Sequence, residues 1–375
     1  MKKYIFLFSI LLIIVFTGCA NEGGGEPQEN NNIINAAEHG VSVENSGESN
    51  SRALQAIIDS AALEGKTVYI PAGEYEFAEN GRQTIGSHCI KMRSGVSIIG
   101  DGEKTVLKPV GSSKYGLDMF YFNDYLDTGE AIYLENCRFE SFVIDASGTS
   151  CEVYTSAGKG FMFNLFKNCH FKNVTVKNTD ATGFGVDCPI DSTIIGCTAI
   201  GCGKAATYEG GGASGFGIGF GYSSDESIVI SDCDAIGNKK FGFFLEHQGR
   251  FNSQKYNATP KNIFTVKDCF ADENLFGFGG IYAYNTVYEN CVSENSIRYG
   301  FYFEESVSCG AKACKSSGEG EACFAILQNT LPEENSEIYF VQCEGSNSPK
   351  DVMLLGKEAC PRVEDCTFSQ INDAE

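Results

Sequence analysis

Residues 268–303 contain the pattern that decides the fold, and they read DCFADENLFGFGGIYAYNTVYENCVSENSIRYGFYF. Two copies of one unit follow each other here, with a polar residue before Cys269 and Cys291 and a glycine before Phe278 and Phe301. The two cysteines are 22 residues apart. Self-similarity at a fixed period of roughly 20–50 residues indicates a repeat architecture, in which each unit buries its apolar face against the next.

The polar or small residue before cysteine recurs along most of the chain. Nine cysteines have this context, at spacings of 22 to 36 residues: Cys137, Cys169, Cys197, Cys233, Cys269, Cys291, Cys314, Cys343 and Cys366. The shortest spacings match one coil of a β-solenoid, and the longer ones match a coil with a loop inserted at a turn. The composition, with 43 Gly, 28 Phe, 17 Tyr and only 8 Pro, favours short strands joined by tight turns. We therefore predict an all-β chain of stacked coils.

One helix is expected before the coils. Residues 51–63 have apolar side chains at helical spacing, with Asn50 or Ser51 as the N-cap and Gly65 after the last turn. The first strand of a solenoid exposes unpaired backbone groups, which could template aggregation if they were left bare. We expect the helix to cover this edge, which is a structural role.

The two segments after the helix carry a family resemblance. Residues 67–75 read TVYIPAGEY and residues 95–102 read GVSIIGDG. With the helix, they resemble the opening of the pectate-lyase-like right-handed parallel β-helix superfamily, and the coil pattern continues the resemblance to the C-terminus. The resemblance implies a single-stranded solenoid of roughly eight to eleven coils from about residue 65 to 370. The superfamily contains lyases, hydrolases, epimerases and non-catalytic surface proteins, so the fold leaves the activity open.

The N-terminus has the features of an export signal. Basic Lys2 and Lys3 precede an apolar run that ends at Phe16, and Thr17-Gly18-Cys19 follows. This resembles the bacterial lipoprotein signal, which implies cleavage before Cys19 and lipidation of its thiol. We predict a signal peptide at 1–18, a flexible tether at 19–32 and a β-helix domain at 33–375, anchored by lipid to the cell membrane or outer membrane and facing outside the cytoplasm. An ordinary secretory signal followed by a chance cysteine is the alternative.

Sixteen cysteines remain besides Cys19. Export and an even number favour disulfides, whereas nine cysteines at one phase of successive coils favour a ladder of buried thiols. We favour the thiols, because a chain of this length has a core without bridges. Seven cysteines lie off this phase and could include a bridge: Cys89, Cys151, Cys188, Cys202, Cys309, Cys323 and Cys360.

Strand alternation predicts which side chains after each repeat glycine point outward. With the aromatic or aliphatic residue after the glycine pointing inward, and with Ile281 and Ala283 also inward, one face carries an acidic and aromatic set: Asp187, Glu246, Glu304, Phe244, Tyr282, Tyr284 and Tyr302. This composition is typical of a sugar-binding groove. We therefore predict a polysaccharide partner, with the four aromatic residues and Glu304 binding it.

Asp187 and Glu246 form the predicted catalytic pair. Side chains two coils apart would be roughly 9–10 Å from each other. This approaches the range of about 6.5–9.5 Å for an acid and a base that leave room for water between them. His247 and Arg250 follow Glu246 and could carry a proton or orient a uronate carboxylate, although His247 could also belong to an exposed turn.

Two known motif patterns of the superfamily are incomplete here. Residues 178–180 resemble the N-T-D motif of polygalacturonases, but the Asp-Asp and Gly-His-Gly motifs do not follow. Residues 187–191 resemble an epimerase D-P-H-D/E motif in which Ile190 replaces His. No certain cofactor is predicted, although Asp180 and Asp191, with Asp187, could bind Ca²⁺ through carboxylate oxygens as in pectate lyases. The glycine-rich residues 210–221 lack the strand-turn-helix context of a dinucleotide loop.

Charge and motifs together limit the function. A net charge of −21 disfavours nucleic acid, because binding to phosphates needs a surface of Lys and Arg. We expect a monomer that acts on a polysaccharide as a lyase or an inverting glycoside hydrolase. The alternatives are a non-catalytic glycan-binding or adhesive surface protein and a structural stalk.

The lipid anchor can be tested by replacing one residue. Cys19→Ala removes the thiol that would be lipidated, so the protein should move from the membrane fraction to the soluble fraction. Fractionation and immunoblotting of cells that express either form measure this, and an unchanged distribution would show that Cys19 is not the anchor.

Overall fold

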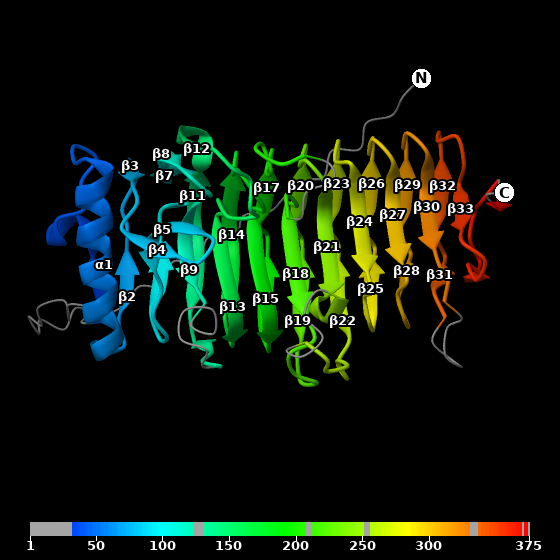
Figure 1. Ribbon diagram of the computed structural model, residues 1–375, viewed down its shortest axis with the longest axis horizontal. Helices are drawn as coiled ribbons and strands as arrows, with labels where there is room; N and C mark the ends of the chain where they lie inside the picture. The colour runs from blue at the N-terminus through cyan, green and yellow to red at the C-terminus, as the bar shows by residue number, and fades with distance from the viewer. Residues whose placement is uncertain are drawn as a thin grey trace, which may run out of the picture. The chain divides into compact units, whose positions relative to one another are not determined.

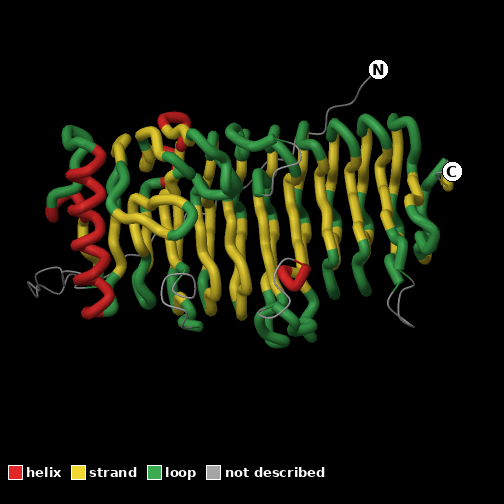
Figure 2. Tube along the Cα trace, in the orientation of Figure 1, coloured by secondary structure: helices red, strands yellow, loops and turns green. Residues whose placement is uncertain are grey.

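The computed structural model describes residues 32–123, 131–207, 212–250, 256–330, 337–369 and 371–373, without the side chains of Arg250 and of residues 371–373. Residues 32–375 form one compact unit. Its strands stack into coils, as Figure 1 shows, and their pairings form three parallel ladders. Figure 2 shows one long helix at the end of the stack. Within the described ranges no helix is long and apolar enough to cross a membrane.

The first ladder is β1(Ile33–Asn35), β2(Thr67–Tyr69), β6(Ser97–Ile99), β11(Arg138–Asp145), β14(His170–Lys177), β16(Ser192–Ile195), β19(Ile228–Ser231), β22(Phe264–Lys267), β25(Thr286–Glu289), β28(Gly310–Lys312), β31(Tyr339–Val341) and β34(Arg362–Glu364). The second ladder shares β11 and β14 with the first and adds β3(Gly73–Phe77), β7(Thr105–Pro109), β17(Thr198–Ile200), β20(Asp234–Ile236), β23(Phe270–Asp272), β26(Val292–Glu294), β29(Lys315–Ser317) and β32(Glu344–Ser346).

The third ladder is β5(Gly86–Lys91), β9(Leu117–Phe122), β13(Phe161–Lys167), β15(Phe184–Ile190), β18(Phe216–Phe220), β21(Phe241–His247), β24(Phe276–Ile281), β27(Tyr299–Glu304), β30(Ala322–Leu327), β33(Val352–Leu355) and β35(Ile371–Asp373). Beside it, β4(Gly81–Gln83) pairs antiparallel with β5, and β10(Leu134–Glu135) pairs with β13. A separate pair joins β8(Gly111–Ser113) and β12(Thr149–Cys151). These ladders confirm the predicted parallel β-helix.

The helix α1(Gly47–Glu64) covers the first coil (Figure 1). Its apolar side chains Leu54, Ile58 and Ala61 are fully buried in the same core cluster as the coils. The predicted C-terminal cap at Gly65 is confirmed, but the helix begins earlier than expected, with Ser46 as its N-cap. Asn50, one of the two predicted caps, is buried inside the helix and donates to the carbonyl of Glu76 at 3.0 Å, so its amide attaches the helix to β3.

The residue before each of the nine cysteines forms a corner, but the corners are of two kinds. Seven lie between the first and second ladders, whereas Asn136 and Asn168 lie between the third and first ladders, so Cys137 and Cys169 do not share the predicted phase of the other seven cysteines. All nine such residues have φ between 50° and 61°: Asn136, Asn168, Gly196, Asp232, Asp268, Asn290, Ala313, Gln342 and Asp365. Gly, Asn and Asp adopt this left-handed conformation most readily, which explains why they predominate in the motif.

The cysteine after each corner points into the coil. Of the sixteen cysteines in the described residues, all are unbridged and thirteen are buried. The Cys269 thiol donates to the carbonyl of Lys267 at 3.1 Å. Burial raises the pKa of the Cys197 and Cys291 thiols well above the usual value, so both stay neutral. The thiols therefore serve as small core side chains with weak hydrogen bonds.

A column of phenylalanines fills the core behind the third ladder. Successive rings from Phe184 to Phe324 are stacked with centroids 4.7 to 5.0 Å apart: Phe184, Phe216, Phe243, Phe278, Phe301 and Phe324. Each ring belongs to the next coil, so this column fixes the register between coils. The glycine-rich residues 216–220 form strand β18 of this ladder, and Phe216, rather than Ile218, pairs with Phe184.

Replacing one ring of the column should weaken the whole stack. Phe243→Ala leaves a cavity between Phe216 and Phe278, so we expect a loss of about 3–5 kcal/mol in the free energy of unfolding. Denaturant unfolding followed by circular dichroism measures the loss. Phe243→Leu, which keeps most of the volume, is the control with a smaller loss. A cost below about 1 kcal/mol for the alanine variant would contradict the column's structural role.

Candidate active site

Asp187, Gly219 and Glu246 lie side by side on the outward face of the third ladder. Gly219 pairs with Glu246 across β18 and β21. On its other side, the Gly219 N–H donates to Asp187 Oδ1 at 2.7 Å. With coils about 4.8 Å apart, the backbones of Asp187 and Glu246 are separated by roughly 10 Å with a glycine between them. The structure thus places the two carboxylates two coils apart on one face, as alternation predicted.

These residues line a groove of about 500 Å³ that is open to solvent. Its floor includes Gly185, Gly217 and Gly219, where the ladder has no side chains. Polar groups around the floor include Lys159, Thr182, Lys240 and Gln248, and an apolar edge is formed by Phe241, Phe244 and Ile281. A concave site with a few converging polar groups and one apolar edge is the usual form of a ligand site.

Asp187 is a groove carboxylate with a raised pKa. Burial raises the pKa of its carboxyl group, and the positive charge of Lys159 and the Gly219 N–H offset only part of that effect. A carboxyl group with a raised pKa can act as a general acid near neutral pH.

Gln248 lies between the two carboxylates. A Cβ on Gly219 would be 2.8 Å from the Gln248 Cδ and 2.7 Å from Asp187 Oδ1, so both side chains border the space above this glycine. Gln248 Nε2 also donates to Glu246 Oε1 at 3.4 Å. The Gln248 amide therefore fills the space above Gly219 between the two carboxylates, and a substrate can enter this space only when Gln248 moves.

Lys159 brings a positive charge to the other end of the groove. A Cβ on Gly185 would be 2.9 Å from its Nζ, and the same Nζ donates to Met162 Sδ at 3.4 Å. A thioether is a weak acceptor, so this ammonium retains capacity for a stronger partner.

The predicted aromatic set is divided by the structure. Phe244 lines the groove, and Tyr302 lies two coils further along the same outward row. Tyr302 is only 8% exposed and donates its hydroxyl to Glu304 Oε2 at 3.1 Å, so its ring is covered by neighbours. Glu304 pairs with Ile281, one coil beyond the groove.

Tyr282 and Tyr284 do not share this outward face. Strand β24 ends at Ile281, which points outward with Glu246 instead of inward as predicted. Tyr282 follows as a left-handed corner with φ 50°, and Tyr284 packs against the core and His247. The predicted alternation assumed that the strand continues to Tyr284. Because the strand ends at Ile281 and the chain turns at Tyr282, neither tyrosine points in the predicted direction.

His247 belongs to the wall of the coil and is absent from the groove lining. Its Nε2 is 2.9 Å from the carbonyl of Ala258, and its Nδ1 accepts from the Gly249 N–H at 3.1 Å. Both ring nitrogens therefore bind the backbone, which corrects the predicted placement beside Glu246. Arg250 ends a short 3-10 helix, η4(Gln248–Arg250), and its side chain lies outside the described residues.

Asp180 and Asp191 lie at opposite ends of β15 and cannot bind one cation together. The strand has seven residues, which corresponds to roughly 20 Å. Asp180 is buried with Lys204 Nζ 3.5 Å from its Oδ1, and Asp191 is a corner whose N–H donates to Ser227. In the described ranges no cluster of three acidic, His or Cys side chains could hold a metal, which corrects the predicted Ca²⁺ site.

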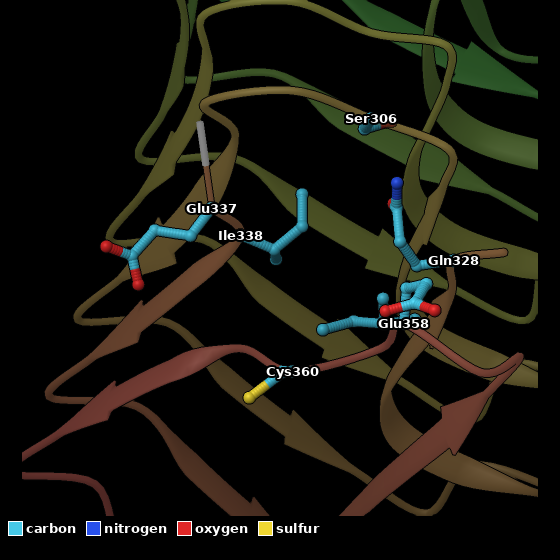
Figure 3. Close-up of a pocket in the computed structure, with 7 residues that line it drawn as sticks. Ser306, Gln328, Glu337, Ile338, Glu358 and Cys360 are labelled. Carbon is cyan, nitrogen blue, oxygen red and sulfur yellow. The ribbon is translucent and has the colours of Figure 1, made fainter. Parts of the chain in front are cut away.

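Several groove residues escaped the sequence analysis. Lys159, Thr182 and Ser214 each precede a glycine that precedes a ladder phenylalanine, and Gln248 follows the end of β21. The residue before each repeat glycine also borders the groove, whereas the prediction covered only the residues after each glycine. A much smaller pocket, with a volume of about 10 Å³, lies near the last coils and is lined by residues that include Gln328, Glu358 and Cys360 (Figure 3). It lies apart from the groove residues.

The raised pKa of Asp187 predicts a pH-dependent stability. Because the folded state favours the protonated form, ionisation costs stability as the pH rises from the unfolded pKa through the raised folded pKa. Asp187→Asn removes this cost, so its melting temperature at pH 7 should exceed that of the parent by roughly 1–3 °C. The gain should vanish near pH 3. Scanning calorimetry at both pH values measures it, with exposed Asp225→Asn as control; a lower melting temperature at pH 7 would contradict the assignment.

Two solved structures are similar to this chain in fold. ORF18 of Geobacillus virus E2 is similar over 90% of this chain and 60% of its own, with 15% identity and a TM-score of 0.62. A tailspike protein of E. coli bacteriophage HK620, solved with a pentasaccharide, is similar over 91% of this chain and 66% of its own, with 12% identity and a TM-score of 0.55. These likenesses show the fold.

A curated relative matches a short part of the chain. Mannuronan C5-epimerase AlgE1 of Azotobacter vinelandii is 44% identical over 63 residues, which are 16% of this chain and 4% of that protein. The family model described as "Rhamnogalacturonase A/epimerase, pectate lyase-like" matches residues 33–302, well over half of the chain. The protein therefore belongs to this pectate-lyase-like family, as its opening segments suggested.

Proposed function

We propose that this protein hydrolyses a polysaccharide in the groove of the third ladder, with inversion at the anomeric carbon. The observation that carries the proposal is the pair Asp187 and Glu246, two coils apart across the glycine floor. Membership of a family whose description names a rhamnogalacturonase, and fold similarity to a tailspike solved with a pentasaccharide, support a carbohydrate ligand.

Each carboxylate has a defined role in this reaction. Asp187, whose carboxyl pKa is raised by burial, gives its proton to the glycosidic oxygen as the bond to the anomeric carbon breaks. Glu246 takes a proton from the water that attacks this carbon from the opposite side. The two sugars leave with the elements of one water molecule, and solvent returns the proton to Asp187 and removes the one on Glu246.

Elimination from a uronate is the second candidate. Lys159 and Lys240 place two ammonium groups in the groove of a chain whose net charge is −21. A lyase must neutralise the uronate carboxylate before a base removes the adjacent proton, and lysines can do both. A glycan-binding surface protein without catalysis remains the alternative to both enzymes.

Two variants and two readouts test the proposal. On alginate, rhamnogalacturonan or a neutral glucan, Asp187→Asn and Glu246→Gln should each lower turnover at least about a hundredfold, because each removes a positioned acid or base. Reducing-end formation with NMR of the first anomer released measures hydrolysis, and ultraviolet absorbance of unsaturated uronate measures elimination.

Asp225→Asn, an exposed carboxylate away from the groove, is the matched control and should keep full turnover. Retained activity in both groove variants would refute the assignment of acid and base. Unsaturated products would favour the lyase, and binding without any product would favour the non-catalytic alternative.

We also propose that the protein acts outside the cytoplasm, held by lipid on Cys19. The support is the N-terminal sequence, since residues 1–31 lie outside the described residues. A flexible tether at 19–32 would let the groove reach an extended polymer.

A further inference from the structure

The outward side chain before each ladder glycine changes character along the stack. In the first coils of the groove this position holds Lys159, Thr182 and Ser214. In the next coils it holds Phe241, Phe276 and Tyr299, which pair with one another in the ladder. One row therefore passes from polar side chains at the candidate active site to aromatic side chains beyond it.

The aromatic residues form one stacked cluster on the outside of the coils. Centroids are 4.4 Å apart for Phe241 and Phe244, 4.6 Å for Phe241 and Phe276, and 5.2 Å for Phe276 and Tyr302. Tyr299 is 2% exposed and packs against Tyr302 at 5.4 Å. Tyrosines therefore support the cluster, while Phe244 and Phe276 are half-buried and keep part of their rings accessible.

A glycine makes room for this cluster. Gly279 lies between Phe244 and Tyr302 in the ladder, and a Cβ there would be 2.8 Å from Cδ1 of the Phe241 ring. Any larger residue would push this ring away from its neighbours. Gly279 therefore leaves room for the Phe241 ring in the stack.

An ion pair gives the aromatic surface a polar border. The Cζ atom of Arg298 is 5.8 Å from the centroid of the Phe276 ring and 4.9 Å from the centroid of the Tyr299 ring. The Arg298 Nε donates to Glu321 Oε1 at 2.6 Å. Guanidinium and carboxylate groups beside an apolar surface offer donors and acceptors to hydroxyl groups. A sugar ring has matching features, with C–H groups on its face and hydroxyls on its rim.

The cluster is continuous with the groove, because Phe241, Phe244 and Ile281 belong to both. We propose that Phe276, with Phe244 and the Arg298–Glu321 pair, forms a second glycan subsite that binds a sugar unit of the same polymer away from the cleaved bond. This inference rests on the proposed function for the identity of the polymer. The subsite would add affinity for long chains and leave the chemistry at Asp187 and Glu246 unchanged.

Binding is measured in a chain that cannot turn over. In the Asp187→Asn, Glu246→Gln background, isothermal titration with alginate, rhamnogalacturonan and a neutral glucan identifies the polymer that binds. Phe276→Ala should weaken its binding roughly tenfold. Phe276→Trp should retain it, because a Trp ring keeps an apolar surface at this position. Val229→Ala, an exposed apolar residue on β19 of the first ladder, is the matched control and should change nothing.

Activity measurements separate this proposal from the proposed function. In the otherwise unchanged chain, Phe276→Ala should raise KM for the polymer without lowering kcat, and kcat/KM for short oligosaccharides should stay constant. If groove variants abolish activity while Phe276→Ala keeps polymer affinity, the subsite is wrong and the active site stands. If no glycan is cleaved but Phe276→Ala weakens binding, the subsite stands and the enzyme assignment fails.

Two further outcomes would overturn the subsite. Sedimentation velocity that shows a dimer converted to a monomer by Phe276→Ala would mean that a second copy covers the cluster. Lack of binding to every polymer of the panel would also contradict it.

Discussion

The structure depends on the stacking of identical inward side chains from coil to coil. Phenylalanines at 4.7 to 5.0 Å behind the third ladder and cysteines at the corner before the second ladder repeat at one phase. A ring or thiol shifted by one residue would face solvent and leave a gap in the core, because strand side chains alternate with a period of two. Register is therefore fixed from inside, and the outward positions are left free to vary.

This freedom explains how one regular ladder can carry a chemically uneven surface. Along the outward face, glycines at 185, 217 and 219 open a floor, carboxylates at 187 and 246 border it, and aromatic rings follow in the next coils. Burying Asp187 costs stability at neutral pH, and the regular core offsets that cost. Proteins often lose stability at positions where a side chain is needed for activity.

The sequence allowed most of the fold to be predicted, because the corner residue, the cysteine and the glycine before phenylalanine each have one structural reason. The Asp187–Glu246 pair could be predicted for the same reason, since both follow a ladder phenylalanine within one unbroken strand. Tyr282 and Tyr284 could not, because the strand ends at Ile281 and no local residue signals where a left-handed tyrosine turns the chain. His247 was misplaced because its partners, Ala258 and Gly249, come from an inserted loop.

A crystal structure of the Asp187→Asn, Glu246→Gln variant with a bound oligosaccharide tests the central claim most directly. The account predicts that the coil register is retained, that a glycosidic oxygen lies above Gly219 between positions 187 and 246, and that the sugar chain continues toward Phe276. An oligosaccharide on another face, or a register in which the two substituted side chains do not share one outward row, would contradict it.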